Sequence, residues 1–310
     1  MTTRALVGVL CATAALVFAA GCGGDDGSSS AGDVITADGS STVGPFTTKA
    51  AEDWKAAGGA DVTVGISGTG GGFERFCAGE TDISNASREI DEDEAALCED
   101  AGIEYVELQV ATDALTNVVN PANDWATCLT VGQLTKIWEP KSKVTSWKQV
   151  DASFPDVALK LYGPGTDSGT FDYFTDAING EEGASRTDYS ASEDDNVIVQ
   201  GVSGDEGALG YFGFSYFEQN QDKLKALEVD GGSGCVAPSA ATAQDGSYTP
   251  LARPLFIYVK LSSLQDKDGV EDFVRYALDN EQSIAEEAQF VPLSQQQIDT
   301  QVQKLEDALS

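Results

Sequence analysis

Hydrophobic and polar positions alternate along the chain between short apolar runs and longer segments with helical spacing. Runs of four to eight apolar or β-branched residues predict strands, and apolar residues repeating every three to four positions predict helices. Strands that alternate with helices indicate an α/β fold with largely parallel sheets. The predicted strands cover 34–38, 62–67, 103–111, 114–120, 157–163, 225–229 and 254–260. The predicted helices cover 45–57, 71–78, 91–100, 131–138, 168–179, 194–202, 211–219, 267–289 and 294–309.

Two apolar stretches, around 105–120 and 253–262, are long and far apart in sequence. We expect them to cross between two lobes. The first lobe would comprise 33–113 with 254–310, and the second 114–253.

The N-terminal segment predicts export. Arg4 precedes an apolar run over 5–20, which is shorter than the roughly 20 residues that span a membrane. Residues 1–21 read as a signal peptide, and the Gly/Ser/Asp-rich stretch 22–32 reads as a flexible tether. The junction Ala20-Gly21-Cys22 resembles a bacterial lipoprotein signal, which implies a lipid on Cys22, although Ala19 stands where that pattern usually has Leu. The alternative is an ordinary cleaved signal with a free Cys22.

Cysteine usage agrees with an oxidising compartment. Without the signal and the anchor candidate, four cysteines remain, and an even count in an exported protein favours two disulfides over four free thiols. Three pairings are possible. We favour Cys77–Cys98, which closes a short loop, and Cys128–Cys235, which closes a long one.

Composition narrows the function. The chain holds 51 acidic and 18 basic residues, a net charge of −33, which disfavours nucleic acids and anionic membrane surfaces as partners. Screening confines bulk charge to about 8–10 Å, so a few donors in a cleft can still bind an anion. The chain contains no His, which excludes Ser–His and Cys–His catalysis and most zinc sites. We therefore expect no enzyme activity, metal or cofactor.

Three Gly/Ser/Thr clusters each follow a predicted strand and precede a predicted helix. They cover 39–42, 67–72 and 163–170. Free amides at a helix N-terminus, a positive dipole end and hydroxyl groups together bind anions. One such cluster is more often a simple helix cap. Three at the carboxyl ends of strands predict a ligand site.

A small oxyanion also needs a fixed cation. Arg88 is the first candidate, against a surface ion pair with an acidic neighbour such as Glu89, because its planar guanidinium matches a tetrahedral anion. Arg186 is the second, with a structural role as its alternative. Arg75 reads as a surface residue.

At these residues the chain resembles the PstS/SphX family of phosphate-binding proteins. The matching segments include ADGSSTV, VGISGTGGGFERFCAGETDISNASREI and LKLYGPGTDSGTFDYFTDAINGEEGASRTDYSASEDDNVIVQGV, and the likeness extends over the whole mature chain. The resemblance implies a two-lobed class II periplasmic-binding-protein fold that encloses phosphate in the cleft between the lobes. The site residues that it implies are Ser41, Thr42, Val43, Thr69, Gly70, Ser168, Gly169 and Thr170.

The charged residues depart from the better-known branch of that family. Pro164 stands where that branch has an Arg, so we assign the guanidinium to Arg88. Asp167 is our candidate for the carboxylate that accepts the proton of hydrogen phosphate, with helix capping as the alternative.

The predicted function is phosphate capture for an ABC-type importer by a monomer anchored on the outer face of a bacterial cell membrane. Its partners would be inorganic phosphate and membrane permease subunits. The alternatives are another tetrahedral oxyanion (sulfate or molybdate), a surface phosphatase, or an adhesin or sensor on the same fold.

Overall fold

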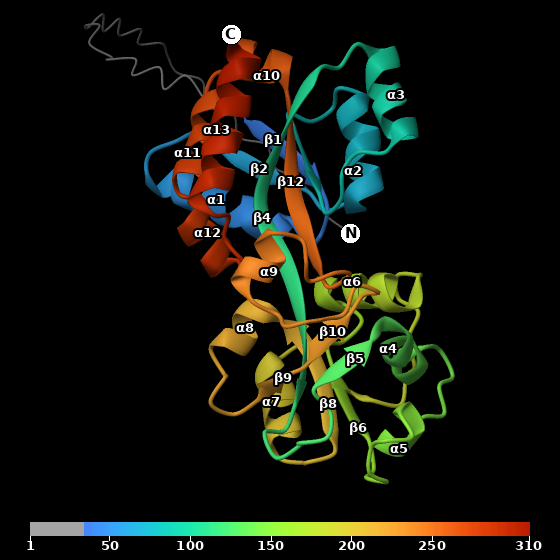
Figure 1. The fold of residues 1–310 in the computed structure, drawn as a ribbon. Coiled ribbons are helices and arrows are strands. Elements are labelled where there is room, and N and C mark those ends of the chain that lie inside the picture. Colours follow the sequence, from blue (N-terminus) through green and yellow to red (C-terminus); the bar gives the residue numbers. More distant parts are fainter. Residues whose placement is uncertain (1–33) are drawn as a thin grey trace, which may run out of the picture. The chain divides into compact units, whose positions relative to one another are not determined.

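Two long antiparallel strands, β4 (Tyr105–Val119) and β12 (Ala252–Lys260), run through the centre of the fold (Figure 1). The structure is a computed structural model and describes residues 34–310. Strand β4 pairs with β12 up to Ala114 and with β8 (Ala208–Gly213) from Leu115 onward. One continuous strand therefore contributes to both lobes.

The first lobe contains the β2-β1-β3-β12-β4 part of the large sheet. Strand β1 is parallel to β2 and β3, whereas β12 is antiparallel to β3 and β4. Its further strands are β1 (Ile35–Gly39), β2 (Val62–Val64) and β3 (Ile83–Ala86). Its helices are α1 (Gly44–Ala56), α2 (Gly68–Cys77), α3 (Glu92–Ala101), α10 (Leu261–Asp266), α11 (Val270–Asp279), α12 (Glu281–Glu287) and α13 (Gln295–Leu309).

The second lobe continues the same sheet in the order β4-β8-β6-β7, with β9 also on β4, and adds a small sheet of order β11-β10-β5. Its further strands are β5 (Cys128–Thr130), β6 (Lys160–Gly163), β7 (Ser190–Ala191), β9 (Lys225–Ala226), β10 (Glu228–Asp230) and β11 (Cys235–Val236). Its helices are α4 (Val131–Trp138), α5 (Trp147–Val150), α6 (Gly169–Asn179), α7 (Asp195–Ser203), α8 (Phe214–Glu218) and α9 (Ala240–Gln244).

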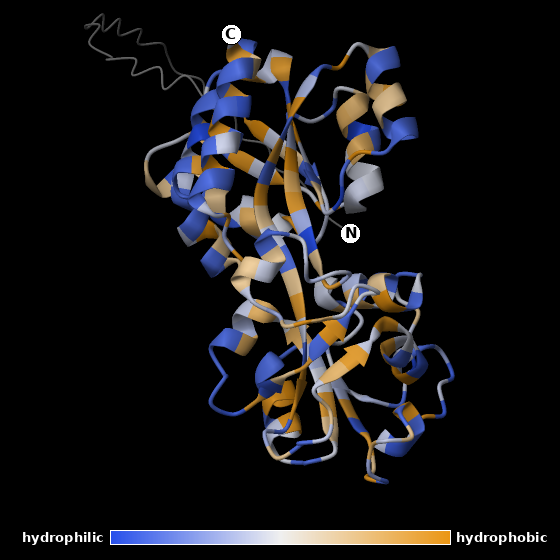
Figure 2. Cartoon of the chain, in the orientation of Figure 1, coloured by the Kyte–Doolittle hydropathy of each residue, from blue (hydrophilic) through white to orange (hydrophobic). Residues whose placement is uncertain are grey.

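Each lobe has its own buried core. In the first lobe, α1, α11 and α13 pack apolar side chains onto β1, β4 and β12. In the second, one cluster contains Trp138 and Tyr211 and another contains Phe212. Figure 2 shows hydrophobic residues concentrated on the central strands and polar residues on the outer helix faces. Burial of these faces, at about 25 cal/mol per Å², holds each lobe together.

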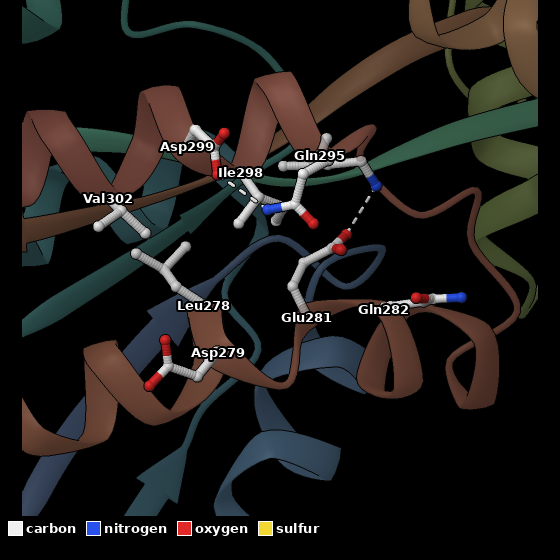
Figure 3. Close-up of a pocket in the computed structure, with 9 residues that line it drawn as sticks. Leu278, Asp279, Glu281, Gln282, Gln295, Ile298, Asp299 and Val302 are labelled. Atoms are coloured by element: carbon white, nitrogen blue, oxygen red, sulfur yellow. Dashed lines mark hydrogen bonds between the residues drawn. The ribbon is translucent and has the colours of Figure 1, made fainter.

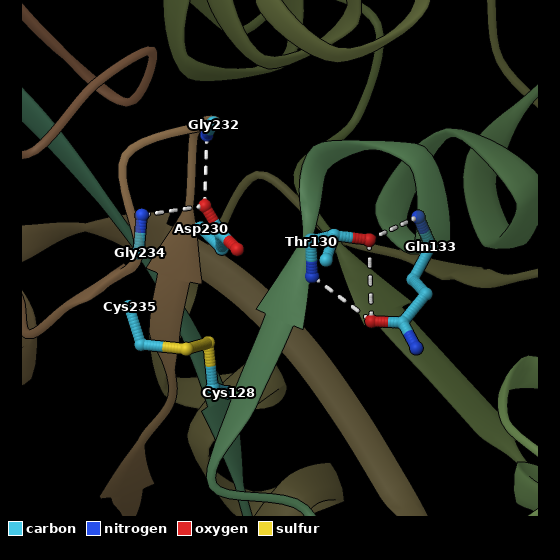
Figure 4. Close-up of a disulfide and its surroundings, with 7 residues drawn as sticks. All are labelled: Cys128, Thr130, Gln133, Asp230, Gly232, Gly234 and Cys235. Carbon is cyan, nitrogen blue, oxygen red and sulfur yellow. Dashed lines mark hydrogen bonds between the residues drawn. A yellow bond between two sulfur atoms is a disulfide. The ribbon is translucent and has the colours of Figure 1, made fainter.

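Both favoured disulfides are confirmed. Cys77 joins Cys98, which ties α2 to α3. Cys128 joins Cys235 across the small sheet, beside a turn in which the Asp230 carboxylate accepts hydrogen bonds from Gly232 N and Gly234 N (Figure 4). The described residues include one group of candidate metal ligands, Cys128, Glu228 and Cys235, and its two thiols are used in this disulfide.

Several predicted elements need correction. The runs 103–111 and 114–120 form one strand, β4, rather than two. The predicted helix 211–219 begins as the end of β8, because Tyr211 and Phe212 are fully buried between strand neighbours. The predicted helix 267–289 is split near Asn280 into α11 and α12. The sheet is mixed rather than largely parallel, since β12 and β4 run antiparallel to their neighbours.

The N-terminal predictions, namely the signal peptide, the tether and lipidation of Cys22, lie outside the described residues. Within residues 34–310, no helix combines the length and apolar character that a membrane span requires.

Candidate functional site

A small cavity lies where the loops after β1 and β2 approach helix α6 and the start of β12. Its volume is about 80 Å³, which is room for a few water molecules or one small ion. Both lobes contribute to its wall. The lining residues are Ser40, Ser41, Thr42, Gly68, Thr69, Ser87, Asp172, Tyr173, Asp176, Glu182 and Arg253.

Two helix N-termini from the first lobe meet at this cavity. Ser41 and Thr42 lie in the turn that leads into α1, which is closed by a hydrogen bond of 2.9 Å from Gly44 N to Ser40 O. Backbone amides at the start of a helix have no acceptor within that helix, and the helix dipole makes this end attractive to an anion. Helix α2 begins at Gly68, beside Thr69. The sequence thus places donors from two loops around one space.

Glycines allow these two loops to approach. A Cβ atom on Gly72 of α2 would lie 2.5 Å from the Cα atom of Gly39, closer than any real contact. Gly39 itself has φ of +133°, a conformation that other residues rarely adopt. The close packing of α2 on β1 therefore depends on glycine at position 72, and the backbone conformation at position 39 requires glycine as well.

Hydroxyl groups complete this wall. Thr69 Oγ1 lies 3.1 Å from Ser87 Oγ, and Ser87 N donates to Thr69 Oγ1 at 3.3 Å. Ser87 follows β3, so three successive strand ends contribute to the cavity. Each hydroxyl can rotate to donate to an anion.

Arg253 supplies the cation. Its Nη2 donates to Thr42 Oγ1 at 3.0 Å and lies 3.3 Å from Asp113 Oδ2. The guanidinium carbon lies 3.7 Å from the ring centre of Tyr173, and the Tyr173 hydroxyl donates to Pro250 O at 2.8 Å. The Asp113 carboxylate, the Tyr173 ring and the Thr42 hydroxyl together hold the guanidinium at the wall of the cavity, which Arg253 lines.

The paired carboxylate is costly to bury. Burial raises the pKa of the Asp113 carboxyl above its ordinary value, and the neighbouring Arg253 opposes part of that shift. Asp113 is 6% exposed. Because Arg253 keeps this buried charge compensated, removing the arginine affects stability as well as the site.

The third loop faces the first across the two lobes. A second cavity, of about 180 Å³, is lined by Ser41 and Thr42 together with Ser168, Gly169 and Thr170. A Cβ atom on Gly169 would lie 3.2 Å from Thr42 Oγ1. Ser168 caps α6, with its Oγ accepting from Thr170 N at 3.2 Å. Ser41 and Thr42 of the first loop therefore line both cavities, one shared with the second loop and the other with the third.

Acidic side chains from the second lobe form the opposite wall. Asp172, in the first turn of α6, lines the cavity with Asp176 and Glu182. Burial raises the pKa of the Asp172 carboxyl, the charge of Glu182 adds to the shift, and Arg253 opposes it. A carboxylate in this position can accept a hydrogen bond from a protonated oxyanion.

The structure does not bring Arg88 to this cavity. Its guanidinium makes two hydrogen bonds of 2.7 Å to the Glu94 carboxylate, and its side chain is 45% exposed. The ion-pair alternative thus describes its environment, with Glu94 in place of Glu89. The capping box that begins α3 positions Glu94, which explains why Arg88 turns away.

The remaining candidate residues from the sequence also do not line the two cavities. Val43 N donates to Ser40 Oγ at 3.4 Å, within its own loop. Gly70 and Asp167 are not among the residues that line either cavity, and Asp167 N donates to the Glu193 carboxylate. Arg186 is 5% exposed and donates to Ile137 O and Val144 O, so it has the structural role given as its alternative.

Arg75 combines two environments. It binds the surface carboxylate of Glu80 and also the buried carboxylate of Asp38. Its side chain is 48% exposed, as a surface reading expects.

Sequence reasoning missed Arg253, Ser87 and Asp172. Arg253 is the first residue of the stretch 253–262 that was predicted to cross between the lobes, and a crossover is where a cleft residue is expected. Ser87 directly precedes Arg88, so the residue that lines the cavity is adjacent in sequence to the predicted arginine.

Comparison with known proteins identifies the family to which this chain belongs. A family model described as a PBP superfamily domain matches residues 26–281. The chain belongs to this superfamily and, within it, to the PstS/SphX family.

Two curated relatives support that assignment. Protein SphX of Synechocystis sp. is 49% identical over 265 residues, covering 84% of this chain and 79% of that protein. The phosphate-binding protein PstS of Staphylococcus saprophyticus is 42% identical over 297 residues, covering 95% and 91%.

Solved structures agree. The crystal structure of a possible phosphate-binding protein from Planctomyces limnophilus superposes with a TM-score of 0.86 at 46% identity, covering 90% of this chain and 99% of that one. The two-lobed α/β fold expected from the sequence is thereby confirmed.

Proposed function

We propose that this protein binds inorganic phosphate between its lobes and delivers it to an ABC-type importer. The observation that carries the proposal is that the second and third Gly/Ser/Thr loops and Arg253 all approach Ser41 and Thr42 of the first loop. A relative at 42% identity is named a phosphate-binding protein, which favours phosphate among the oxyanions.

In this proposal, amides, hydroxyls and one guanidinium from both lobes would donate hydrogen bonds to the phosphate oxygens. The amides of Ser41 and Thr42 and the hydroxyls of Thr69 and Ser87 approach from the first lobe. Ser168, Gly169 and Thr170 approach from the second lobe, and Arg253 takes the guanidinium role first assigned to Arg88. In this proposal three predicted site residues do not contact phosphate and belong only to the loops around it, namely Val43, Gly70 and Asp167.

Selection against sulfate would come from Asp172 rather than Asp167. Hydrogen phosphate can donate a hydrogen bond to this carboxylate, whereas sulfate at neutral pH has no proton to donate. Sulfate would leave two like charges facing each other with an unsatisfied acceptor, which disfavours it by several kcal/mol.

Capture would occur by closure of the predicted lobes, 33–113 with 254–310 and 114–253, about the two crossover strands. Closure replaces the water around phosphate by fixed donors. The closed form would then dock on membrane permease subunits as a monomer.

We also propose that the protein lies outside the cytoplasm and that Cys22 carries a lipid. We expect it to bind its ligand without catalysing a reaction. Two disulfides among the described residues agree with an oxidising compartment. Mass spectrometry of the membrane fraction should find a diacylglyceryl adduct on Cys22, and an unmodified mature N-terminus would contradict the anchor. Release of phosphate from a chromogenic ester at a rate above background would contradict the binding-only role.

Calorimetry on phosphate-free protein tests the binding proposal. We expect phosphate to bind at least 100-fold more tightly than sulfate or molybdate, since a lost proton-donating contact is worth several kcal/mol. Equal affinities for phosphate and sulfate, or no binding of either, would contradict it.

A further inference from the structure

A separate cleft lies on the first lobe between the α11–α12 corner and the N-terminal half of α13 (Figure 3). Its volume is about 470 Å³. Leu278, Ile298 and Val302 form an apolar strip along it. None of these residues lines either cavity at the oxyanion site.

A buried carboxylate points into this cleft. Glu281 is 1% exposed, and its Oε1 accepts from Leu293 N at 2.9 Å. Its Oε2 is buried without a hydrogen-bond partner among the described atoms. In Figure 3 the carboxylate of Glu281 extends from α12 toward Gln295 of α13. A buried acceptor of this kind is unfavourable unless a donor reaches it.

The charge around Glu281 selects the kind of donor. Asp279 and Asp299 also line the cleft, and none of its lining residues is basic. Burial, with a smaller contribution from Glu286, raises the pKa of Glu281 to about 7. A cation that donates hydrogen bonds would satisfy Oε2 and balance the acidic rim.

The side chains that line the cleft favour an organic cation over a metal ion. Among residues 34–310, the one group of three side chains close enough to share a metal ion is at Cys128, so these carboxylates are not arranged for a metal. The apolar strip instead suits an alkyl chain, because burying each CH₂ group against it removes apolar surface from water. An ammonium on an alkyl chain matches both features.

We propose that this cleft is a second ligand site that takes a protonated primary alkylamine, with its ammonium on Glu281 Oε2 and its chain along Leu278, Ile298 and Val302. The amine can be a free small molecule or the side chain of a lysine. Both carry the same ammonium on a short chain.

Titration of methyl-labelled protein with n-butylammonium chloride tests the site. We expect saturable shifts of the Leu278, Ile298 and Val302 methyl signals, which sodium chloride at equal ionic strength and n-butanol do not reproduce. The absence of saturable shifts up to 50 mM, or equal shifts with sodium chloride, would overturn the proposal. A parallel titration with N-acetyl-lysine methylamide identifies the source, since the tighter of the two amines is the better mimic.

Variants assign the shifts to the buried carboxylate. Glu281→Gln keeps an acceptor for Leu293 N but removes the charge. It should weaken the binding of n-butylammonium at least about tenfold. Glu287→Gln makes the same charge change on the same helix, away from the cleft, and should leave the affinity within about twofold. Asp299→Asn, on the rim, gives a second test if Glu281→Gln folds poorly, and should weaken binding by more than twofold. Unchanged affinity in both Glu281→Gln and Asp299→Asn would refute the site.

Discussion

Substituting Arg253 tests the proposed phosphate site most sharply, because two arginines compete for the same role. Arg253 reaches Thr42 Oγ1 at 3.0 Å beside the cavity, whereas Arg88 is engaged by Glu94. A hydrogen bond to a charged group is worth about 1.5–3 kcal/mol, so losing one weakens phosphate binding by roughly 10- to 150-fold. Arg253→Lys keeps the charge but loses the planar guanidinium, and its loss of phosphate affinity should lie in this range.

A second variant separates binding from stability. Arg253→Met leaves Asp113 buried without its partner, which typically destabilises a protein by about 3–5 kcal/mol. The double substitution Arg253→Met with Asp113→Asn removes both charges. It should recover much of the free energy of unfolding without recovering phosphate affinity.

The assay is calorimetric titration of phosphate into protein freed of bound phosphate, with folding checked by circular dichroism. Arg88→Ala is the matched control and should change the dissociation constant by less than about twofold, because its ion pair is exposed. Wild-type affinity in Arg253→Lys together with a large loss in Arg88→Ala would refute the assignment and restore Arg88 to the site.

Three further changes have defined outcomes. Asp172→Asn should narrow the preference for phosphate over sulfate by about tenfold or more, and an unchanged ratio in competition titrations would exclude Asp172 as the proton acceptor. Glu281 has a pKa raised from 4.5 to about 7, so its contribution to stability is present below pH 4.5 and is lost as pH rises through 7, by at most about 3 kcal/mol. The free energy of unfolding of Glu281→Gln, measured in urea between pH 5 and 8, should therefore fall less with rising pH than that of the wild type. The same dependence on pH in both proteins would contradict the raised pKa of Glu281. Replacing Cys128 and Cys235 by serine opens a loop with a sequence separation of 107 and should lower the free energy of unfolding by about 4–5 kcal/mol. The same change at Cys77 and Cys98, with a separation of 21, should lower it by about 3 kcal/mol. Equal losses, or a larger loss at Cys77 and Cys98 in denaturant unfolding, would show that strain or packing outweighs loop entropy.

Local patterns predicted the elements whose signal lies within one segment. The helices at α1, α4 and α13 follow from periodic apolar residues, and their bounds differ from prediction by at most two residues. Strand β8 was missed because Tyr211 and Phe212 fit either structure locally, and burial between β4 and β6 decides for a strand. Tertiary contacts of this kind are not encoded in a short window.

The loops of the site were predictable for the same reason. A Gly/Ser/Thr cluster between a strand and a helix has a local signature, and in the structure Thr42 lines one cavity with Thr69 and another with Gly169. The charged residues were not predictable from local sequence, since an arginine can act 211 residues from its hydrogen-bond partner, as Arg253 does with Thr42. Arg88 illustrates the converse, because a capping residue six positions away takes its guanidinium.

A crystal structure of the protein grown with phosphate tests the central claim directly. We expect the phosphate to contact the Ser41 and Thr42 amides, the Thr69 hydroxyl, the Ser168–Thr170 loop and the Arg253 guanidinium, at hydrogen-bond distances of about 2.7–3.2 Å. A phosphate bound elsewhere, or one that contacts Arg88 while Arg253 stays with Asp113 alone, would contradict the account.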